Sequence, residues 1–365
     1  MPRYKMSDVV VEINERENNP AESKYERFVG LEHYVSGEVI IRNFGSTERL
    51  ESTMKVFQSG DILVARRNVY LKRAATVDFD GLTSGDSIVL RPTNYLIGRI
   101  LPFVLNTDAF WDFADRYSDG TMSKRLSPKT LMKYEFDLPN DDELSLLADT
   151  LWAANDTREA YQELLRQSNE LVKSQFIELS EKSGGKPTRM GDIASYVNGA
   201  AFKPRDWSLS GKPIIRIQNL NDPSATFNYF SGTIDSKYLV QKGDILISWA
   251  THLEAYIWNG DEAWLNQHIF KVVFDKTDID KTFFLFAANV ALKEAFKKAH
   301  GFKASMEHIK RGDFEDAVVY LPDLDTQKQF AIFAHQLDKS KFELKQSIAN
   351  ITALIKSLMQ QDSSN

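Results

Sequence analysis

Six histidines are the residues whose type could most readily support catalysis or metal binding. They are His33, His252, His268, His300, His308 and His335. Their spacing is not that of metal ligands, and the chain has no cysteine to complete such a site. We expect His268, in the apolar strand NQHIFKV, to be a hydrogen-bonded structural residue. Glycine-rich phosphate loops and the G-x-S-x-G motif are also absent from the sequence. These residues therefore predict no catalytic site.

One acidic motif resembles a nuclease site at first sight. Pro322-Asp323 is followed by Glu343-Leu344-Lys345, which fits the loose spacing of a PD…E-x-K motif. The intervening segment has the composition of a helix, and 20 residues of helix would separate the two carboxylates by about 30 Å. Two carboxylates must lie within a few ångströms to share a metal ion. The motif therefore predicts no nuclease.

Clusters of basic residues point to nucleic acid instead. Residues 65–73 (ARRNVYLKR) and 120–134 (GTMSKRLSPKTLMKY) each carry four cations and no anion, and residues 292–311 carry six cations and two anions. Aromatic residues stand among polar and basic ones in AAFKPRDWS and SWATHLEAYIW. Lysine and arginine contact phosphates, and arginine, asparagine, glutamine and lysine read base edges. The net charge of −6 taken alone argues against nucleic-acid binding, but net charge says little about local basic patches. Any single cluster is equally typical of a solvated surface, but recurrence in both halves favours DNA.

These residues are positioned by a module that the chain contains twice, with an offset of 183 residues. GDILVA at 60–65 returns as GDILIS at 243–248, and the Leu-Pro pair that ends at Pro139 returns at Pro322. Between these landmarks each half has a second apolar strand, SIVLRP or HIFKVVF. An aromatic-rich helical stretch follows, TDAFWDFADRY or KTFFLFAANVALKEAFKKA. Gly120 or Gly301 ends each stretch, as glycine often does after a helix, and a basic cluster follows.

A long helix is predicted after each Leu-Pro pair, because residues 141–182 and 323–361 contain neither proline nor glycine. Spacings of four and three residues mark a heptad seam in each helix. The seams are Leu147, Leu151, Ala154, Arg158, Tyr161, Leu165, Ser168, Val172 and Gln175, and Phe330, Ala334, Leu337, Lys341, Leu344, Ile348, Ile351, Ile355 and Leu358. The second seam is the first one shifted by 183 residues, including its basic interruption. We therefore predict an α+β fold with two similar domains, residues 1–140 and 184–322. Two long antiparallel helices, residues 141–183 and 323–361, separate them in a tandem repeat with pseudo-two-fold symmetry.

Longer segments of both halves carry a family resemblance. In the first half they are FVGLEHYVSGEVIIRNFGS, STMKVFQSGDILVARRNVYLKRAATVDFDGLTSGDSIVLRP, FWDFADRYSDGTMSKRL and YEFDLP. In the second half they are IIRIQNL, VQKGDILISW, LNQHIFKV and LPDLDTQKQF. Across about residues 4–360, the chain resembles the specificity subunit of Type I restriction-modification systems. The second helix begins with DTQKQF, which has the family's usual glutamine, whereas the first begins with DDELSL, which lacks it.

The resemblance implies a DNA-reading subunit without catalysis of its own. Each of two target-recognition domains reads one half of a bipartite double-stranded DNA site, and the conserved helices set the gap between the half-sites. The chain itself holds no cofactor. Two methyltransferase subunits bind it and hold S-adenosylmethionine. The complex is either methylation-only or adds two restriction/translocase subunits, which use ATP and Mg²⁺.

Candidate DNA contacts follow from position and chemistry. In the first domain they are Arg66, Arg67, Lys72, Arg73, Lys124 and Arg125. In the second domain they are Gln218, Asn219, Trp249, His252, Lys303 and Arg311.

Two other interpretations remain open. A fused methyltransferase-specificity enzyme needs an N-P-P-[YF] tetrapeptide for a flipped adenine, and the nearest sequence, NNPAE, lacks the second proline and the aromatic residue. A coiled-coil scaffold would bind proteins only. The chain has no cysteine, no apolar signal-peptide region and no run of about 18 apolar residues. We therefore expect a cytoplasmic protein with no membrane contact.

Overall fold

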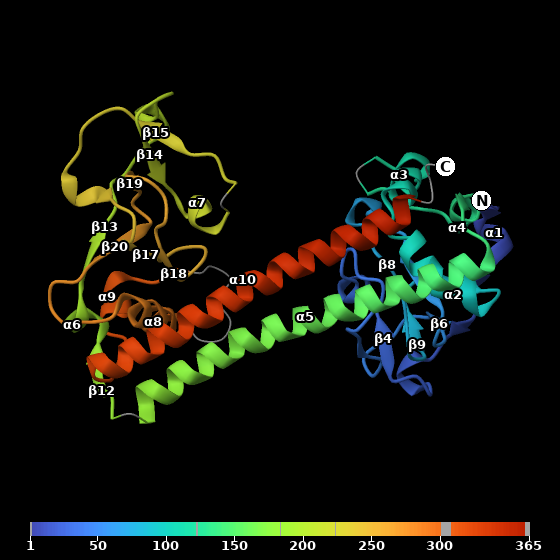
Figure 1. Ribbon diagram of the computed structural model, residues 1–365, viewed down its shortest axis with the longest axis horizontal. Helices are drawn as coiled ribbons and strands as arrows, with labels where there is room; N and C mark the ends of the chain where they lie inside the picture. Colours follow the sequence, from blue (N-terminus) through green and yellow to red (C-terminus); the bar gives the residue numbers. More distant parts are fainter. Residues whose placement is uncertain (1, 122, 183, 223, 301–307, 362–365) are drawn as a thin grey trace. The chain divides into compact units, whose positions relative to one another are not determined.

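The computed structural model describes residues 2–121, 123–182, 184–222, 224–300 and 308–361 (Figure 1). They form two compact units, and each unit is described by itself. The first comprises residues 1–162 and 345–365, and the second comprises residues 163–344. Each unit therefore contains one copy of the repeated module and one end of both long helices.

The module of the first unit is built from short strands and helices. Its strands are β1 (Arg3–Lys5), β2 (Val10–Ile13), β3 (Arg16–Glu17), β4 (Arg27–Val29), β5 (Gly45–Ser46), β6 (Met54–Phe57), β7 (Ile62–Ala65), β8 (Ala74–Thr76), β9 (Gly81–Thr83), β10 (Ser87–Pro92) and β11 (Glu135–Asp137). Its helices are α1 (Met6–Val9), α2 (Tyr95–Val104), α3 (Asp108–Tyr117) and α4 (Pro128–Leu131), with 3-10 turns at Pro20–Glu22, Leu31–His33 and Val69–Leu71. The long helix α5 (Asp141–Lys182) follows.

The module of the second unit has a similar order of elements. Its strands are β12 (Lys186–Arg189), β13 (Ser195–Asn198), β14 (Lys212–Ile215), β15 (Asn228–Phe230), β16 (Leu239–Val240), β17 (Ile245–Ser248), β18 (Glu254–Ile257), β19 (Ala263–Leu265), β20 (Ile269–Val273) and β21 (Val318–Leu321). Its helices are α6 (Met190–Ile193), α7 (Ile217–Asn221), α8 (Lys281–His300) and α9 (Arg311–Glu315), with 3-10 turns at Pro204–Asp206 and Ser236–Tyr238. The long helix α10 (Leu324–Gln361) follows.

Sheet topology shows that the two modules are one fold. The antiparallel sheet β2-β10-β7-β8 corresponds to β13-β20-β17-β18, and the ribbon β1-β11 corresponds to β12-β21. The other sheet runs β6-β9-β4-β5 in the first module and β16-β19-β14-β15 in the second. In both modules it contains one parallel pair, β4 with β9 and β14 with β19. The first module adds β3 at the edge of this sheet. The predicted repeat is therefore confirmed.

The repeated Gly-Asp-Ile-Leu sequence begins the central strand of each module. Gly60 and Gly243 have φ values of 88° and 89°, which glycine adopts without steric cost. The following aspartates accept a hydrogen bond from the backbone N–H three residues earlier, at 2.8 and 2.9 Å. Every residue of β7 and β17 is buried, since alternate side chains enter the two cores on opposite faces of the sheet. A turn and a strand buried on both faces explain why both copies contain the same four residues.

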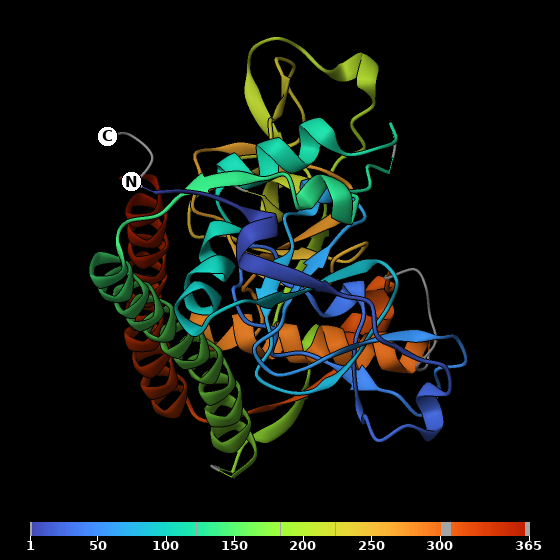
Figure 2. The same ribbon diagram turned by 90° about the vertical axis from the view of Figure 1, so that its right-hand side faces the viewer.

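Helices α5 and α10 run antiparallel. In the first unit, the N-terminal half of α5 and the C-terminal turns of α10 share one core, to which Leu151 and Ile355 belong. These segments lie side by side in both views (Figure 1 and Figure 2). In the second unit the opposite ends meet, with the rings of Phe176 and Phe330 5.5 Å apart. No residue of either predicted seam is exposed. The predicted α+β fold with two long antiparallel helices is confirmed.

The first aromatic-rich helical stretch forms helix α3, as predicted, but the two modules differ in what precedes it. The second module has one helix of 20 residues, α8, whereas the equivalent part of the first module is divided into α2 and α3. Thr107 causes the break, because its side chain accepts from the N–H of Phe110 and begins a new helix. Gly120 adopts a left-handed φ of 94° but follows the end of α3 by three residues, so it does not cap that helix. Gly301 lies outside the described residues.

Within the described parts of the chain, no helix combines the length and the apolar character that crossing a membrane requires.

Candidate nucleic-acid interface

Two loops of the first unit, far apart in sequence, are joined by backbone hydrogen bonds. Arg67 and Arg125 form an isolated antiparallel bridge. On either side of it, the N–H of Leu126 donates to the carbonyl of Arg66 at 2.8 Å, and the N–H of Asn68 donates to that of Lys124 at 2.9 Å. We call residues 66–73 and 123–126 the first paired loops. They bring together the two basic clusters that the sequence separates.

Three arginines of the first paired loops lie together, and two of them share one carboxylate. Arg125 Nη2 lies 2.6 Å from one oxygen of Asp86, and Arg67 Nε lies 3.6 Å from the other. The side chains of both arginines remain nearly half exposed. The third, Arg66, donates from Nε to the carbonyl of Leu126 at 3.2 Å. Asp86 therefore fixes the direction of two guanidinium groups that solvent still reaches.

The charges of this cluster are not balanced. Arg67 and Arg125 share one carboxylate. Burial, followed by repulsion from Arg125, lowers the pKa of Arg66 despite the opposing charges of Asp86 and Glu12. A phosphate brought to this surface would relieve the repulsion, and a guanidinium group can also form two hydrogen bonds to the O6 and N7 of guanine. The first paired loops therefore have the charge and donor geometry of a nucleic-acid contact.

The other three cations predicted in the first domain are held by the protein. Lys72 Nζ lies 3.1 Å from Asp108 Oδ1. Arg73 donates to the carbonyls of Leu31 and Arg67 at 2.9 and 3.1 Å, and Lys124 pairs with Asp115 at 2.7 Å. All six cations thus have partners in the protein. We favour Arg66, Arg67 and Arg125 as DNA contacts because they lie together and two of them share a single carboxylate.

The second unit holds its equivalent loops with the same hydrogen bonds. Ala250 and His308 form the isolated bridge, and the N–H of Ile309 donates to the carbonyl of Trp249 at 3.1 Å. Trp249 N–H also donates to the carbonyl of His268 at 3.5 Å, as Arg66 does to Asp86 at 2.9 Å. The side chains at the equivalent positions are thus Trp249, Ala250, His308 and His268 in place of Arg66, Arg67, Arg125 and Asp86. The backbone is repeated, but the chemistry is not.

Two predicted residues of the second domain are packed into the protein. Trp249 is partly buried and its ring stacks on Phe270, with centroids 5.9 Å apart. Asn219 is only 7% exposed. It accepts from the N–H of Arg216 and donates to two backbone carbonyls. The burial of Asn219 leaves no free surface for a base contact, so we assign it a structural role.

The remaining predicted residues of the second domain are distributed over separate elements. Gln218, in α7, and His252, in the loop before β18, are exposed. Arg311 is exposed but pairs with Glu315 at 2.7 Å. Lys303 lies outside the described residues. The structure therefore brings the predicted contacts together in the first unit but not in the second.

Residue types explain which site residues the sequence did not indicate. The sequence did not indicate Asp86, because an acidic residue is not expected to bind DNA. Its role, which is to orient two arginine side chains, follows only from its position in the structure. His268 was expected to be structural within a strand, but it lies one residue before β20 and is exposed. Its ring contacts that of Trp249, with centroids 5.2 Å apart. The 183-residue offset, applied to the first basic cluster, could have identified positions 249, 250 and 308.

The residues that could suggest catalysis have other roles in the structure. Asp323 caps α10, where it accepts from the N–H of Thr326 at 2.8 Å, and this hydrogen bond lowers its pKa. A continuous helix separates it from Glu343, which agrees with the predicted lack of a nuclease site. Among the residues that the structure describes, no three His, Cys, Asp or Glu side chains lie close enough to hold a metal ion.

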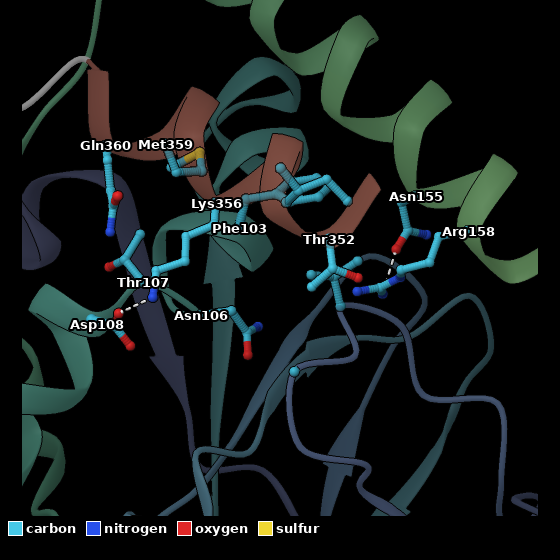
Figure 3. A pocket seen from close by; sticks show the side chains of 13 residues that line it. Phe103, Asn106, Thr107, Asp108, Asn155, Arg158, Thr352, Lys356, Met359 and Gln360 are labelled. Atoms are coloured by element: carbon cyan, nitrogen blue, oxygen red, sulfur yellow. Dashed lines mark hydrogen bonds and ion pairs between the residues drawn. The ribbon is translucent and has the colours of Figure 1, made fainter. Parts of the chain in front are cut away.

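A cavity of about 160 Å³ lies in the first unit where α5 and α10 meet the module. Figure 3 shows Arg158 and Asn155 on one side of it and the pair of Lys356 with Asp108 on the other. Arg158 is buried and donates to Glu38 and Asn155 at 2.8 and 2.9 Å. Sites for small molecules usually measure roughly 300–1,000 Å³. We therefore assign this cavity to the joint between the helices and the module, and not to a ligand.

Comparisons with known proteins show what this chain resembles. Residues 183–353 match the family described as Type I restriction modification DNA specificity domain. The Type I restriction enzyme EcoBI specificity subunit of Escherichia coli is 29% identical over 163 residues, which are 43% of this chain and 34% of that protein. The MjaVIII specificity subunit of Methanocaldococcus jannaschii is 27% identical over 177 residues, 47% of this chain and 40% of that protein. The matches thus cover less than half of either relative.

Two solved structures share the fold along almost the whole chain. One is the S subunit of a Type I restriction-modification system from M. genitalium, with a TM-score of 0.55 and 16% identity, covering 99% of this chain and 95% of that one. The other comes from work on complex assembly and conformational transition of the type I R-M system, with a TM-score of 0.54 and 16% identity, covering 99% and 97%. The resemblance of this chain to the specificity subunits of Type I restriction-modification systems, which its sequence predicts, is therefore confirmed.

Proposed function

We propose that this chain is the DNA-reading subunit of a Type I restriction-modification complex and has no catalytic activity of its own. Each module reads one half of a bipartite site in double-stranded DNA. In this proposal residues 1–140 and 184–322 are the recognition domains. The helices of residues 141–183 and 323–361 set the gap between the half-sites.

The observation that carries the proposal is the gathering of Arg66, Arg67 and Arg125 around Asp86. Net positive charge supplies affinity for the phosphate backbone, and guanidinium groups held in a fixed direction supply base discrimination. The equivalent loops of the second unit lie within the segment that matches a DNA specificity domain. Their different side chains suit a protein that reads two different half-sites.

Partner subunits supply the chemistry in this proposal. Two methyltransferase subunits bind the chain and hold S-adenosylmethionine. Two restriction/translocase subunits, with ATP and Mg²⁺, join them in a restriction complex. The relatives named above are specificity subunits, and this division of labour extends to the present chain as part of the proposal.

The salt dependence of DNA binding tests the arginine cluster. Replacing Arg67 and Arg125 together by alanine, in the complex with methyltransferase subunits, should weaken binding. The slope of log affinity against log salt should flatten by about 0.9 for each phosphate that the variant no longer binds. Arg3→Ala is the matched control, because Arg3 is an exposed arginine paired with Glu135 at 3.1 Å outside the paired loops.

An unchanged slope and affinity in a folded, assembled double variant would contradict the DNA role of the cluster. Loss of assembly with an unchanged slope of the residual binding would place these arginines against the methyltransferase instead. Sequencing of methylated adenines in a host with and without the gene tests the whole proposal. A bipartite motif that depends on the gene is expected.

A further inference from the structure

The first paired loops present two exposed apolar side chains beside their arginines, Tyr70 and Leu71, and Tyr70 is the more exposed. Tyr70 occupies the middle of the 3-10 turn Val69–Leu71 and is 63% exposed. Its neighbour Val69 is buried in the core of the module, at 2%. The turn is therefore anchored on one side and carries an aromatic ring on the other.

The backbone around Tyr70 is held in an unusual conformation. Asn68 and Lys72, on either side of the turn, both adopt left-handed φ values, 56° and 47°. Non-glycine residues rarely adopt this conformation, and it persists only where the surrounding structure enforces it. Ser123 Oγ donates to Asn68 Oδ1 at 3.0 Å, and Lys72 Nζ lies 3.1 Å from Asp108. Such a turn fixes the point on the loop from which the exposed ring projects.

The charges beside Tyr70 indicate what this ring contacts. Arg66 and Arg67 precede the turn, Arg73 follows it, and the bridge to Arg125 joins its base. Cations attract the phosphate backbone and position a protein on the duplex, but sequence is read by contacts to the bases. An aromatic ring has no charge to offer a phosphate. It packs against the methyl group of thymine or enters between base steps.

The second unit supplies an internal comparison. Thr251, at the position of Asn68, is also left-handed, with a φ of 67°. The loop between β17 and β18, residues 249–253, is shorter than the loop of residues 66–73 and contains no 3-10 turn, so Tyr70 has no counterpart there. The repeat has kept the left-handed residue after the bridge and changed the rest of the loop, so the exposed ring belongs to the first module alone.

We infer that Tyr70 contacts bases and determines specificity in the half-site read by the first module. The inference rests on the proposed function, because it names a residue that reads DNA within that proposal. Its chemistry is apolar contact from the ring, and the hydroxyl group is not required.

Tyr70→Ala, Tyr70→Leu and Tyr70→Phe, each in the complex with methyltransferase subunits, test the inference. Tyr95→Ala is the control, since Tyr95 is an equally exposed tyrosine, at 82%, beyond the opposite end of β10. DNA bound from a random library is sequenced, and affinity for the wild-type site and for non-specific DNA is measured across a salt series.

Tyr70→Ala should relax one or two positions of one half-site, leave the other half-site unchanged and weaken cognate binding by about tenfold. Affinity for non-specific DNA and its salt slope should not change. Tyr70→Leu should alter the same positions, and Tyr70→Phe and Tyr95→Ala should select the wild-type motif. Since both tyrosines are exposed, a normal thermal midpoint is expected for every variant.

A Tyr70→Ala complex that selects the wild-type motif overturns the inference and leaves the proposed function standing. The same holds if Tyr70→Ala reduces assembly with the methyltransferase but keeps the motif, because Tyr70 would then face the partner. A wild-type complex that selects no sequence at all overturns the proposed function, and this inference with it.

Discussion

Asn68 and Thr251 occupy the same backbone position in the two modules, and both are left-handed, with φ values of 56° and 67°. Each directly follows the bridge that joins its loop to a second loop, Arg67 with Arg125 and Ala250 with His308. Duplication has therefore preserved a strained backbone conformation while the side chains on it diverged. Such strain is retained where a loop must hold one shape.

Thr251→Gly should stabilise the second unit. A left-handed conformation costs a β-branched residue about 1–2 kcal/mol, and glycine adopts it freely but loses more chain entropy on folding. We expect a net gain of about 1 kcal/mol in the free energy of unfolding, measured by urea denaturation. Ala250→Gly is the control and should not stabilise, because Ala250 has no positive φ. Destabilisation by Thr251→Gly would show that the threonine side chain is needed where it stands.

Asp86→Asn should strengthen non-specific DNA binding, which is the opposite of the arginine variants. The carboxylate lies 2.6 Å from Arg125, and its removal leaves the cluster more positive. In water, a carboxylate repels a phosphate about 8 Å away by about 0.5 kcal/mol. Removing the charge of Asp86 should therefore raise the affinity for DNA roughly twofold at low salt. Discrimination between cognate and non-specific DNA should fall, because the guanidinium groups lose their support. Weaker non-specific binding by titration would contradict the assignment.

Arg158→Met should destabilise the first unit. Arg158 is buried and pairs with Glu38 at 2.8 Å, so its removal leaves a partly buried carboxylate without this partner. Breaking a buried pair from one side costs about 3 kcal/mol, which urea denaturation would detect. The double variant Arg158→Met with Glu38→Gln should recover most of this stability. Arg166→Met, which removes an exposed pair on the same helix, should have no measurable effect.

Asp108 should make the attachment of α10 to the first module depend on pH. Hydrogen bonds from Lys356 and then Lys72 lower the pKa of Asp108 below its usual value. Because the pKa of Asp108 is lower in the folded state than in the unfolded state, its ionised form stabilises the fold. This stabilisation is complete above the unfolded pKa of about 3.9 and is lost as the pH falls through the lower folded pKa. Asp108→Asn should therefore lower the thermal midpoint at pH 7 and match the wild type at the acid end.

Hydrogen exchange in the last turns of α10 provides the local measurement for that prediction. Lys356→Met removes the nearer of the two lysine partners, 2.6 Å from Asp108, and should reproduce part of the effect at pH 7. A difference in thermal midpoint between wild type and Asp108→Asn that stays constant with pH would contradict an electrostatic origin of the effect.

The regular parts of the fold could be predicted because the chain contains them twice. One central strand is ambiguous by itself, but β7 and β17 begin with the same turn at the same offset, and both heptad seams keep one phase. The division of α2 from α3 could not be predicted in this way, because Thr107 acts as a helix cap only in the first module. Comparing the two copies in the sequence predicts the elements that they share, but it does not predict a feature that is present in only one copy.

The site was less predictable because basic residue type does not reveal which charges are already paired. Arg67, Lys72 and Lys124 look alike in the sequence, yet Arg67 shares Asp86 with Arg125, whereas Lys72 and Lys124 pair with Asp108 and Asp115. These partners lie in α3, and the sequence gives no reason to bring that helix to those loops. Asn219 was misjudged for the same reason, since burial depends on the packing of segments that are distant in the chain.

The core of the first unit includes Ile355, Leu358 and Met359, from the last turns of α10. A ribosome makes residues 1–162 first, and then all of residues 163–344, before it adds these three. The domain whose synthesis begins earliest is therefore the last to be completed. A chain released before residue 345 would leave apolar surface of its first module uncovered, and such surface is what chaperones and proteases recognise. The first domain is thus completed only after the second domain and most of α10 have been translated.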